Sequence, residues 1–152
     1  MGKRYNLGCG GDILPGWVNV DVCLDLGPRI EVWDLDEHPW PFPAGTASEI
    51  RAFDIFEHVD DPVGFMVECH ALLEPGGPLR IRTPYYQWID AFTDPTHKRF
   101  PTEHTFDYWI NDGNPLYTNQ NRMFGGIEFV KGKVEPNPVT GQMDVVLVKP
   151  DA

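Results

Sequence analysis

The chain has 152 residues, enough for one folded domain, and its 41% hydrophobic and 23% charged residues are typical of a globular protein. Twelve Lys and Arg residues against 23 Asp and Glu residues give a formal net charge of −11, and so acidic a surface repels a phosphate backbone. We therefore expect no bulk nucleic acid as a partner. No apolar run approaches the roughly 20 residues of a membrane span, and the first residues do not resemble a signal peptide, so we expect no membrane partner.

The three cysteines, Cys9, Cys23 and Cys69, are widely spaced and form no CxxC pair. This pattern indicates neither a disulfide framework nor a zinc knuckle. It favours a reducing compartment, and we expect the protein to be cytoplasmic.

Seven short segments are predicted as β-strands, because they alternate in polarity or are rich in β-branched residues. In chain order they are residues 3–7, 17–22, 30–33, 49–53, 79–83, 127–134 and 143–149. The proline-rich residues 39–43 predict a stiff loop. Residues 62–73 predict a helix, with Asp60 or Asp61 as N-cap and Pro62 in its first turn. Residues 106–110 indicate a short helix, and residues 136–141 a hairpin turn.

Strands separated by crossovers predict an α/β fold: a Rossmann-like, mainly parallel sheet with a C-terminal antiparallel hairpin, in a single domain of residues 1–152. Only nine residues, 8–16, separate the first two strands, whereas a parallel crossover usually needs a dozen or more. We therefore predict a short first crossover, with its helix reduced to a turn.

A glycine turn, Gly8-Cys9-Gly10-Gly11, follows the first predicted strand, and Asp21 and Asp34 end the next two. Open parallel sheets bind ligands beyond the carboxyl ends of their strands, so these three strand ends predict a nucleoside pocket. The pattern departs from the dinucleotide fingerprint, because Ile13 replaces the third glycine and Asp21 follows Gly8 by 13 residues rather than about 20. A cationic nucleoside fits these acids better than a polyphosphate, and a nicotinamide-dependent oxidoreductase is disfavoured.

Five motifs occur in order within residues 5–84: Asn6-Leu7-Gly8-Cys9-Gly10, Gly16-Trp17-Val18-Asn19-Val20-Asp21, Asp34-Leu35-Asp36, Glu57-His58-Val59-x-Asp61-Pro62 and Leu73-x-Pro75-Gly76-Gly77. With them the chain resembles the class I S-adenosylmethionine-dependent methyltransferases, and it is similar to the small methyltransferase-11-like proteins of bacteria and phages. The stretch Asp94-Pro95-Thr96-His97-Lys98-Arg99 also resembles that group. The resemblance implies the class I methyltransferase fold, with S-adenosylmethionine as the cofactor.

The resemblance also implies roles for individual residues. The methionine part of the cofactor would lie against Gly8, Cys9 and Gly10, the ribose against Asp21, and the adenine against Asp34 and Leu35. The sulfonium would lie near the last residues of the fourth strand, Ala52 and Phe53.

We expect residues 84–125, which are rich in aromatic side chains, to form a lid and substrate region for a small-molecule acceptor. His97 is the favoured general base, because histidine titrates near neutrality, and Asp94 would orient it. A loop-stabilising turn from Asp94 to His97 is an equal alternative, and His58 and His104 are further candidate bases. The spacing of Asp94, His97 and His104 matches no standard zinc pattern, so we expect no metal.

Three other interpretations stay open. The chain could be a non-catalytic S-adenosylmethionine- or S-adenosylhomocysteine-binding or regulatory module, because its substrate region is small. It could also use the same cofactor for another reaction, such as cleavage. The helix that precedes the first strand in the family has no counterpart here, which leaves a homo-oligomer as a possible partner arrangement.

Overall fold

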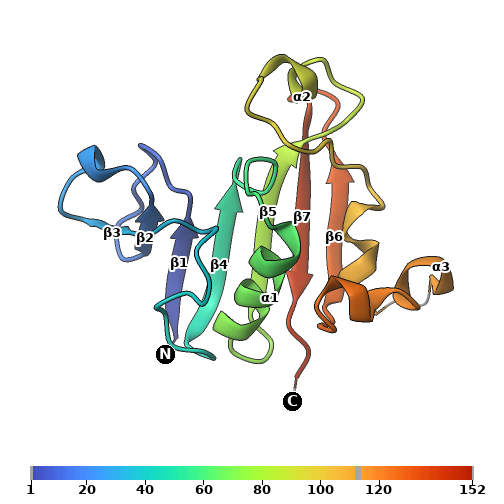
Figure 1. Cartoon of the computed structure of the whole chain (residues 1–152), viewed down its shortest axis with the longest axis horizontal. Coiled ribbons are helices and arrows are strands. Elements are labelled where there is room, and N and C mark those ends of the chain that lie inside the picture. Colours follow the sequence, from blue (N-terminus) through green and yellow to red (C-terminus); the bar gives the residue numbers. More distant parts are fainter. Residues whose placement is uncertain (1, 112–113, 152) are drawn as a thin grey trace.

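The computed structural model describes residues 2–111 and 114–151, which form one seven-stranded sheet in the order β3-β2-β1-β4-β5-β7-β6. The five strands from β3 to β5 in this order are parallel, and β7 runs antiparallel between β5 and β6 (Figure 1). This is the predicted Rossmann-like sheet with its C-terminal hairpin. The strands are β1 (Lys3–Leu7), β2 (Val18–Asp21), β3 (Ile30–Val32), β4 (Ala47–Phe53), β5 (Pro78–Pro84), β6 (Val130–Pro136) and β7 (Gln142–Val148).

The short first crossover is confirmed, and two buried asparagines replace the helix that would normally complete it. Asn6 on β1 donates to the carbonyl of Asp12 and to the side chain of Asn19 on β2. Asn19 in turn bonds the backbone N–H and C=O of Leu14 and the C=O of Trp17. These side-chain amides satisfy backbone groups that a helix would have paired internally, so the connection between β1 and β2 can be a compact loop.

The predicted central helix is α1 (Pro62–Leu72), which connects β4 to β5. Asp61 caps it by accepting from the backbone N–H of Gly64 at 2.8 Å. Phe65, Met66 and Cys69 of α1 are buried against the apolar face of the sheet. Figure 1 shows α1 beside β4 and β5, so this helix covers the middle of the sheet.

The opposite face of the sheet is charged. Register places Arg51 beside Arg80 and Phe53 beside Arg82, on the side away from the buried Ile50, Ala52 and Ile81. Arg80 pairs with Glu49 at 2.6 Å and is 47% exposed, and Arg82 pairs with Asp54 at 2.7 Å. A parallel sheet is normally apolar on both faces, whereas this one buries a single face.

The chain between β5 and β6 divides into two parts. The first contains α2 (Asp90–Thr93) and lies beyond the carboxyl end of β5 (Figure 1). The second contains the 3₁₀ helices η2 (Thr105–Trp109) and η3 (Asn121–Phe124) and the short helix α3 (Pro115–Thr118). Phe106 and Trp109 of η2 pack against Phe56 in the core, so this second part lines the core while the first remains the predicted lid.

Two further features complete the fold. A 3₁₀ helix, η1 (Leu24–Leu26), connects β2 to β3. Within the described ranges, none of the helices has both the length and the apolar character needed to cross a membrane.

Candidate functional site

A cavity of about 210 Å³ opens where β1, β2 and β3 end. Its walls include Gly8, Asp21, Asp34 and Leu35, so three predicted strand ends meet in one place. Ile55, His58 and Val59, from the loop after β4, close the other side. The lining contains three acids and no Lys or Arg, which favours a ligand that carries positive charge.

Asp21 is held rigidly at the end of β2. Its Oδ2 accepts from the backbone N–H of Gly10 at 2.8 Å, and its Oδ1 accepts from the N–H of Cys23 at 2.9 Å. Each carboxylate oxygen can still accept a further hydrogen bond, because an ionised carboxylate has about four acceptor positions. This geometry suits a pair of ligand hydroxyls.

Gly8 takes a left-handed conformation, with φ of +61°, and a Cβ there would lie 2.8 Å from Cγ1 of Ile55. Both facts require glycine, because any other residue would be strained in the left-handed conformation and its Cβ would clash with Ile55. The neighbouring Cys9 is buried, and burial together with the charge of Asp21 raises the pKa of its thiol. Cys9 is therefore a small packing residue of the turn rather than a thiolate nucleophile.

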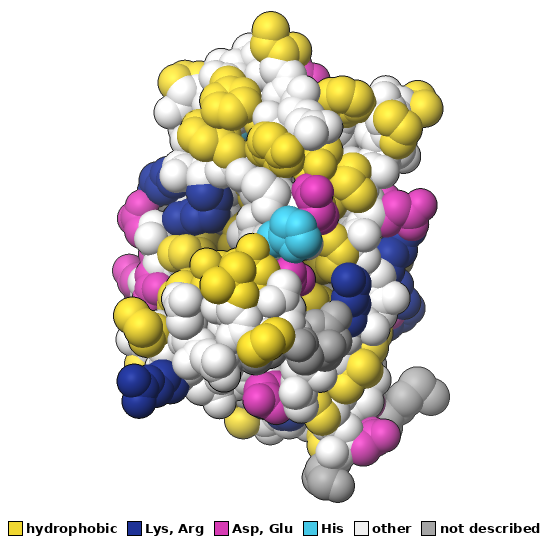
Figure 2. Space-filling view, turned by 90° about the vertical axis from the view of Figure 1, so that its right-hand side faces the viewer, with side chains coloured by type: hydrophobic (Ala, Val, Ile, Leu, Met, Phe, Trp, Pro, Cys, Tyr) yellow, Lys and Arg dark blue, Asp and Glu magenta, His cyan; other side chains and the backbone are white. Residues whose placement is uncertain are grey.

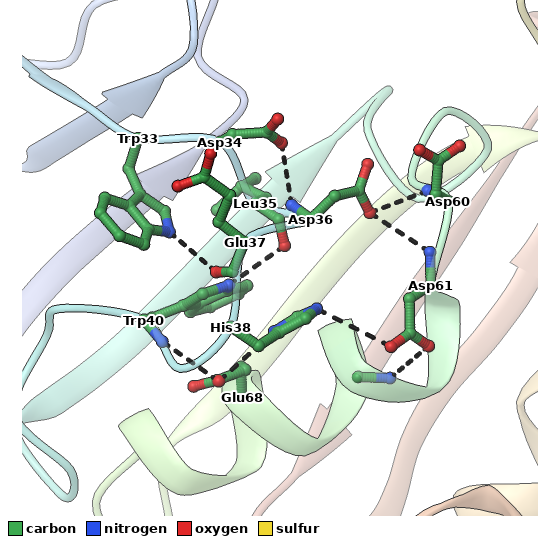
Figure 3. Close-up of polar contacts among 11 residues, drawn as sticks. Trp33, Asp34, Leu35, Asp36, Glu37, His38, Trp40, Asp60, Asp61 and Glu68 are labelled. Carbon is green, nitrogen blue, oxygen red and sulfur yellow. Dashed lines mark hydrogen bonds and ion pairs between the residues drawn. The ribbon is translucent and has the colours of Figure 1, made fainter.

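The loop after β3 forms a second wall of this cavity and is fixed by its own hydrogen bonds (Figure 3). Asp34 accepts from the N–H of Asp36 at 2.9 Å, and Asp36 accepts from the N–H groups of Asp60 and Asp61 at 2.8 and 3.2 Å. The carbonyl of the buried Leu35 accepts from the indole of Trp40. The loop is thus tied to the start of α1.

A further cavity of about 200 Å³ shares Gly8 with the first and lies on the charged face of the sheet. Cys9 and Phe53 line it together with Arg51 and Arg82. The two guanidinium groups lie over the Phe53 ring at 4.2 and 4.6 Å from its centroid. Both arginines are already paired within this cavity, Arg51 with Asp12 and Arg82 with Asp54 at 2.7 Å.

A third cavity, of about 380 Å³, lies beside α2 and shares His58 with the first. Asp94 and His97, the predicted catalytic pair, both line it. His97 Nε2 is 3.6 Å from Asp94 Oδ2, which is longer than a hydrogen bond. Hydrogen bonds from Thr96 lower the pKa of Asp94, so this carboxylate is ionised and shared with the turn of its own loop.

Glu57 is the one functional candidate of this cavity that the sequence suggested only as part of a motif. It is 1% exposed, and burial raises the pKa of its carboxyl to about 7. Its Oε2 accepts from the hydroxyl of Thr83 at 2.9 Å, while Oε1 lies 3.8 Å from His58 Nε2. The available signal was its position in the loop that follows β4, four residues after Phe53, at the edge of the sheet where ligands bind.

Other predicted residues lie outside these cavity walls. Ala52 is fully buried within β4, and Gly10 serves through its backbone bond to Asp21. His104 is 59% exposed, pairs with Asp107 at 2.9 Å and lines none of the three cavities. The structure thus places Gly8, Asp21 and Asp34 in one cavity and Asp94 and His97 in another, and their roles stay predictions.

The sequence matches no protein-family model and no curated protein. Solved structures nevertheless share the fold. The methyltransferase partner of the Trm112 activator from Haloferax volcanii has a TM-score of 0.69 at 13% identity, with 98% of this chain and 83% of that chain covered. A SAM-dependent methyltransferase from Aquifex aeolicus has a TM-score of 0.65 at 15% identity, with coverages of 97% and 81%.

A 16S rRNA adenine methyltransferase from Catenulisporales acidiphilia gives a TM-score of 0.63 at 15% identity, with 97% of this chain and 85% of that chain covered. The fold is therefore that of the class I SAM-dependent methyltransferases. At these identities the similarity defines the fold and not the activity. The finer resemblance to the small bacterial and phage type stays a prediction.

Proposed function

We propose that this protein is an S-adenosylmethionine-dependent methyltransferase. The observation that carries the proposal is the meeting of Gly8, Asp21 and Asp34 in one acidic cavity that adjoins a second cavity at His58. The carboxylate of Asp21 suits the ribose hydroxyls of the cofactor, and a neighbouring cavity supplies space for an acceptor. The fold shared with known methyltransferases supports the same conclusion.

The three cavities suggest how the cofactor would lie. The adenosine would occupy the first cavity, with its ribose hydroxyls on Asp21 and its adenine beside Asp34 and Leu35. The methionine part would pass Gly8 toward Cys9 and Phe53, where its carboxylate would have to displace Asp12 from Arg51 or Asp54 from Arg82. The methyl group would then face the cavity of Asp94 and His97.

In the proposed reaction, the acceptor's nucleophilic atom forms a bond to the methyl carbon while the carbon–sulfur bond breaks, and S-adenosylhomocysteine leaves as a neutral thioether. The protein's main contribution is to align the acceptor and exclude water. If the acceptor arrives protonated, Nε2 of His97 is the proposed base, and the Ala91 carbonyl orients the ring through Nδ1 at 2.8 Å. Asp94 lies 3.6 Å from the same Nε2 and would stabilise the imidazolium that forms. Lys98 is engaged by Asp60, so its ammonium is not available to an acceptor in the described conformation.

We propose a small molecule as the acceptor. The net charge of −11 and the carboxylates of the acceptor cavity disfavour a nucleic acid backbone. One neighbour acts on rRNA, so the fold alone does not distinguish the two classes. The exposed Ile89, Phe92 and Phe100 give the mouth region an apolar character, and Figure 2 shows hydrophobic side chains gathered at this end of the molecule.

The same exposed side chains support a homo-oligomer as a second part of the proposal, because Ile89 and Phe92 would contact either an acceptor or a second copy of the chain. Light scattering of the purified protein tests it.

We also propose the cytoplasm as the compartment. Cys9, Cys23 and Cys69 are free thiols, which agrees with a reducing environment.

Calorimetric titration with S-adenosylhomocysteine tests the cofactor assignment. Asp21→Ala should weaken binding at least tenfold, because it removes two charge-assisted acceptors from the ribose position. Asp25→Ala is the matched control, because Asp25 is an exposed acid on the same connection and lines none of the cavities. Absence of binding by the wild type, or unchanged binding by Asp21→Ala, would contradict the assignment.

The small size of the lid region supports one alternative, a regulatory module that binds the cofactor without turnover. Transfer of tritium from labelled cofactor to a component of a cell extract separates the two functions. Transfer excludes the module, and binding without any transfer favours it. Intact cofactor after incubation alone excludes a cofactor-cleaving enzyme.

A further inference from the structure

Three potential metal ligands converge in the wall of the acceptor cavity. Glu57, His58 and His97 each offer one donor atom, and the three atoms lie within 4.8 Å of one another. The two imidazole rings meet edge to face, with their centroids 4.9 Å apart. Glu57 and His58 come from the loop after β4, and His97 comes from the loop after α2, so tertiary structure brings them together.

Both histidines are already oriented by hydrogen bonds at the ring nitrogen that faces away from the cluster. His97 Nδ1 bonds the carbonyl of Ala91 at 2.8 Å, and His58 Nδ1 bonds the hydroxyl of Thr96 at 3.1 Å. In each ring Nε2 remains as the donor atom. Histidine ligands of metal sites typically have their second nitrogen fixed in this way.

Glu57 supplies an independent observation. It is 1% exposed, and its Oε1 has no hydrogen-bond partner among the described residues although that atom is buried. The atom is aimed at the cluster, 3.8 Å from His58 Nε2. A buried acceptor without a partner is costly, and native structures usually satisfy it. A cation between Glu57 and the two imidazoles would do so.

The surrounding charge and backbone both favour a cation at this point. The cavity is also lined by Asp54, Asp90 and Asp94, and its lining contains no Lys or Arg. The loop of His97 is fixed to the loop of Glu57, because the N–H of Lys98 donates to the carbonyl of Glu57 at 2.8 Å. The backbones of the two loops that carry the donors are therefore fixed to one another without a metal.

We propose that Glu57, His58 and His97 form a binding site for a divalent first-row transition-metal ion such as Zn²⁺. Two imidazoles and one carboxylate are a known ligand set for such ions. In a tetrahedral zinc site the donor atoms lie about 3.3 Å apart, so side-chain movements on the order of 1 Å suffice. The spacing of Asp94, His97 and His104 gave no reason to expect a metal, because the sequence does not place Glu57 and His58 beside His97.

The site also suggests the chemistry of the acceptor, and this step alone rests on the proposed methyltransferase function. Three protein ligands leave a coordination position open toward the cavity. A hydroxyl or phenol oxygen bound there would lose its proton more easily and become a better nucleophile. The metal, and not His97, would then activate the acceptor, because the Nε2 lone pair of His97 would be bound to the metal.

Titration of the full chain with Zn²⁺ tests the site. A Cys23→Ser background removes the exposed thiol, and chelator-treated protein provides the metal-free start. We expect binding of one equivalent, at least tenfold weaker after His97→Ala, His58→Ala or Glu57→Gln. His104→Ala is the matched control, because His104 also pairs with an acid three residues away but lies outside the cluster. No stoichiometric binding, or equal loss in the control, would overturn the proposal.

Two added measurements keep the outcomes separate. Co²⁺ in place of Zn²⁺ should give a visible absorption band in the parent protein that Glu57→Gln abolishes, even if a histidine variant folds poorly; a band that survives Glu57→Gln overturns the site. S-adenosylhomocysteine binding is measured on the same metal-free samples. Metal binding without nucleoside binding would retain the metal site and reject the methyltransferase. Nucleoside binding without metal binding would reject the metal site alone.

Discussion

Glu57→Gln should make the metal-free protein more stable at pH 8 and leave it nearly unchanged at pH 5. Burial of the Glu57 carboxyl raises its pKa to about 7, against 4.5 for an ordinary glutamic acid. Between these two values the folded protein holds a proton that the unfolded chain has released, so stability falls as pH rises through this window. At pH 8 the folded state carries a buried charge whose oxygen Oε1 has no hydrogen-bond partner among the described residues.

The magnitude follows from the shift. A difference of one pKa unit corresponds to about 1.4 kcal/mol, so the shift of Glu57 corresponds to about 3 kcal/mol of lost stability above pH 7. Glutamine keeps an acceptor for the Thr83 hydroxyl and has no charge to bury. The free energy of unfolding of the variant minus that of the wild type should therefore increase by about 2.5 kcal/mol from pH 5 to pH 8, because pH 5 already lies above the pKa of 4.5 of the unfolded chain.

Urea unfolding followed by tryptophan fluorescence, with a chelator present, measures this difference at both pH values. Groups that titrate in both proteins cancel in the comparison. Glu31→Gln is the control, because Glu31 is exposed on β3 and its replacement should shift stability equally at both pH values. A constant difference for Glu57→Gln, or a variant that is less stable than the wild type at pH 8, would refute the reasoning.

Three further substitutions test the turn, the helix cap and the core. Gly8→Ala should lower the melting temperature and weaken S-adenosylhomocysteine binding, because the left-handed φ and the contact with Ile55 together cost about 1–3 kcal/mol; unchanged values would show that the turn tolerates a side chain. Asp61→Ala should cost about 1 kcal/mol in urea unfolding, with Asp61→Asn nearly neutral, because the cap to Gly64 is lost only in the first. Phe56→Ala should cost about 3–5 kcal/mol in the same assay, because Phe56 is 1% exposed among aromatic rings; a loss below 1 kcal/mol would contradict its place in the core.

The strand-end residues of the site were predictable because of a geometric rule. In a parallel sheet all carboxyl ends lie at one edge, so a residue at the end of each strand is brought to the same place. Gly8, Asp21 and Asp34 needed only the strand assignments to be placed together, and the structure brings them into one cavity. The helix cap was predictable for a different reason: capping is a local interaction, and Asp61 was one of the two N-cap candidates in the sequence.

The cluster around Glu57 was not predictable in this way. His97 reaches it because Lys98 donates to the Glu57 carbonyl and Arg99 to the Phe56 carbonyl, at 2.8 and 2.6 Å. These are contacts between irregular loops, and no periodicity of the sequence encodes them. The start of β6 also differs from the prediction. The predicted strand begins at residue 127, whereas β6 begins at Val130. Phe129 instead forms an isolated bridge to Ile110, a distant contact that the sequence pattern does not encode.

One feature of the sheet could have been read from the sequence. Leu79, Ile81 and Thr83 alternate with Arg80 and Arg82, whereas a central parallel strand covered on both faces is apolar throughout. The alternation indicates a sheet with one polar face, which is what the structure has.

The charged face of the sheet has a thermodynamic consequence. Unfolding such a domain exposes less apolar area than unfolding an α/β domain of equal length that is covered on both sides, because its second face carries charged side chains, such as the 47% exposed Arg80, in place of apolar ones. Both the heat-capacity increment and the urea m-value scale with newly exposed surface, so each should be small for 152 residues. The stability curve of this protein is accordingly expected to be shallow, with little change in folding free energy between cold and warm conditions.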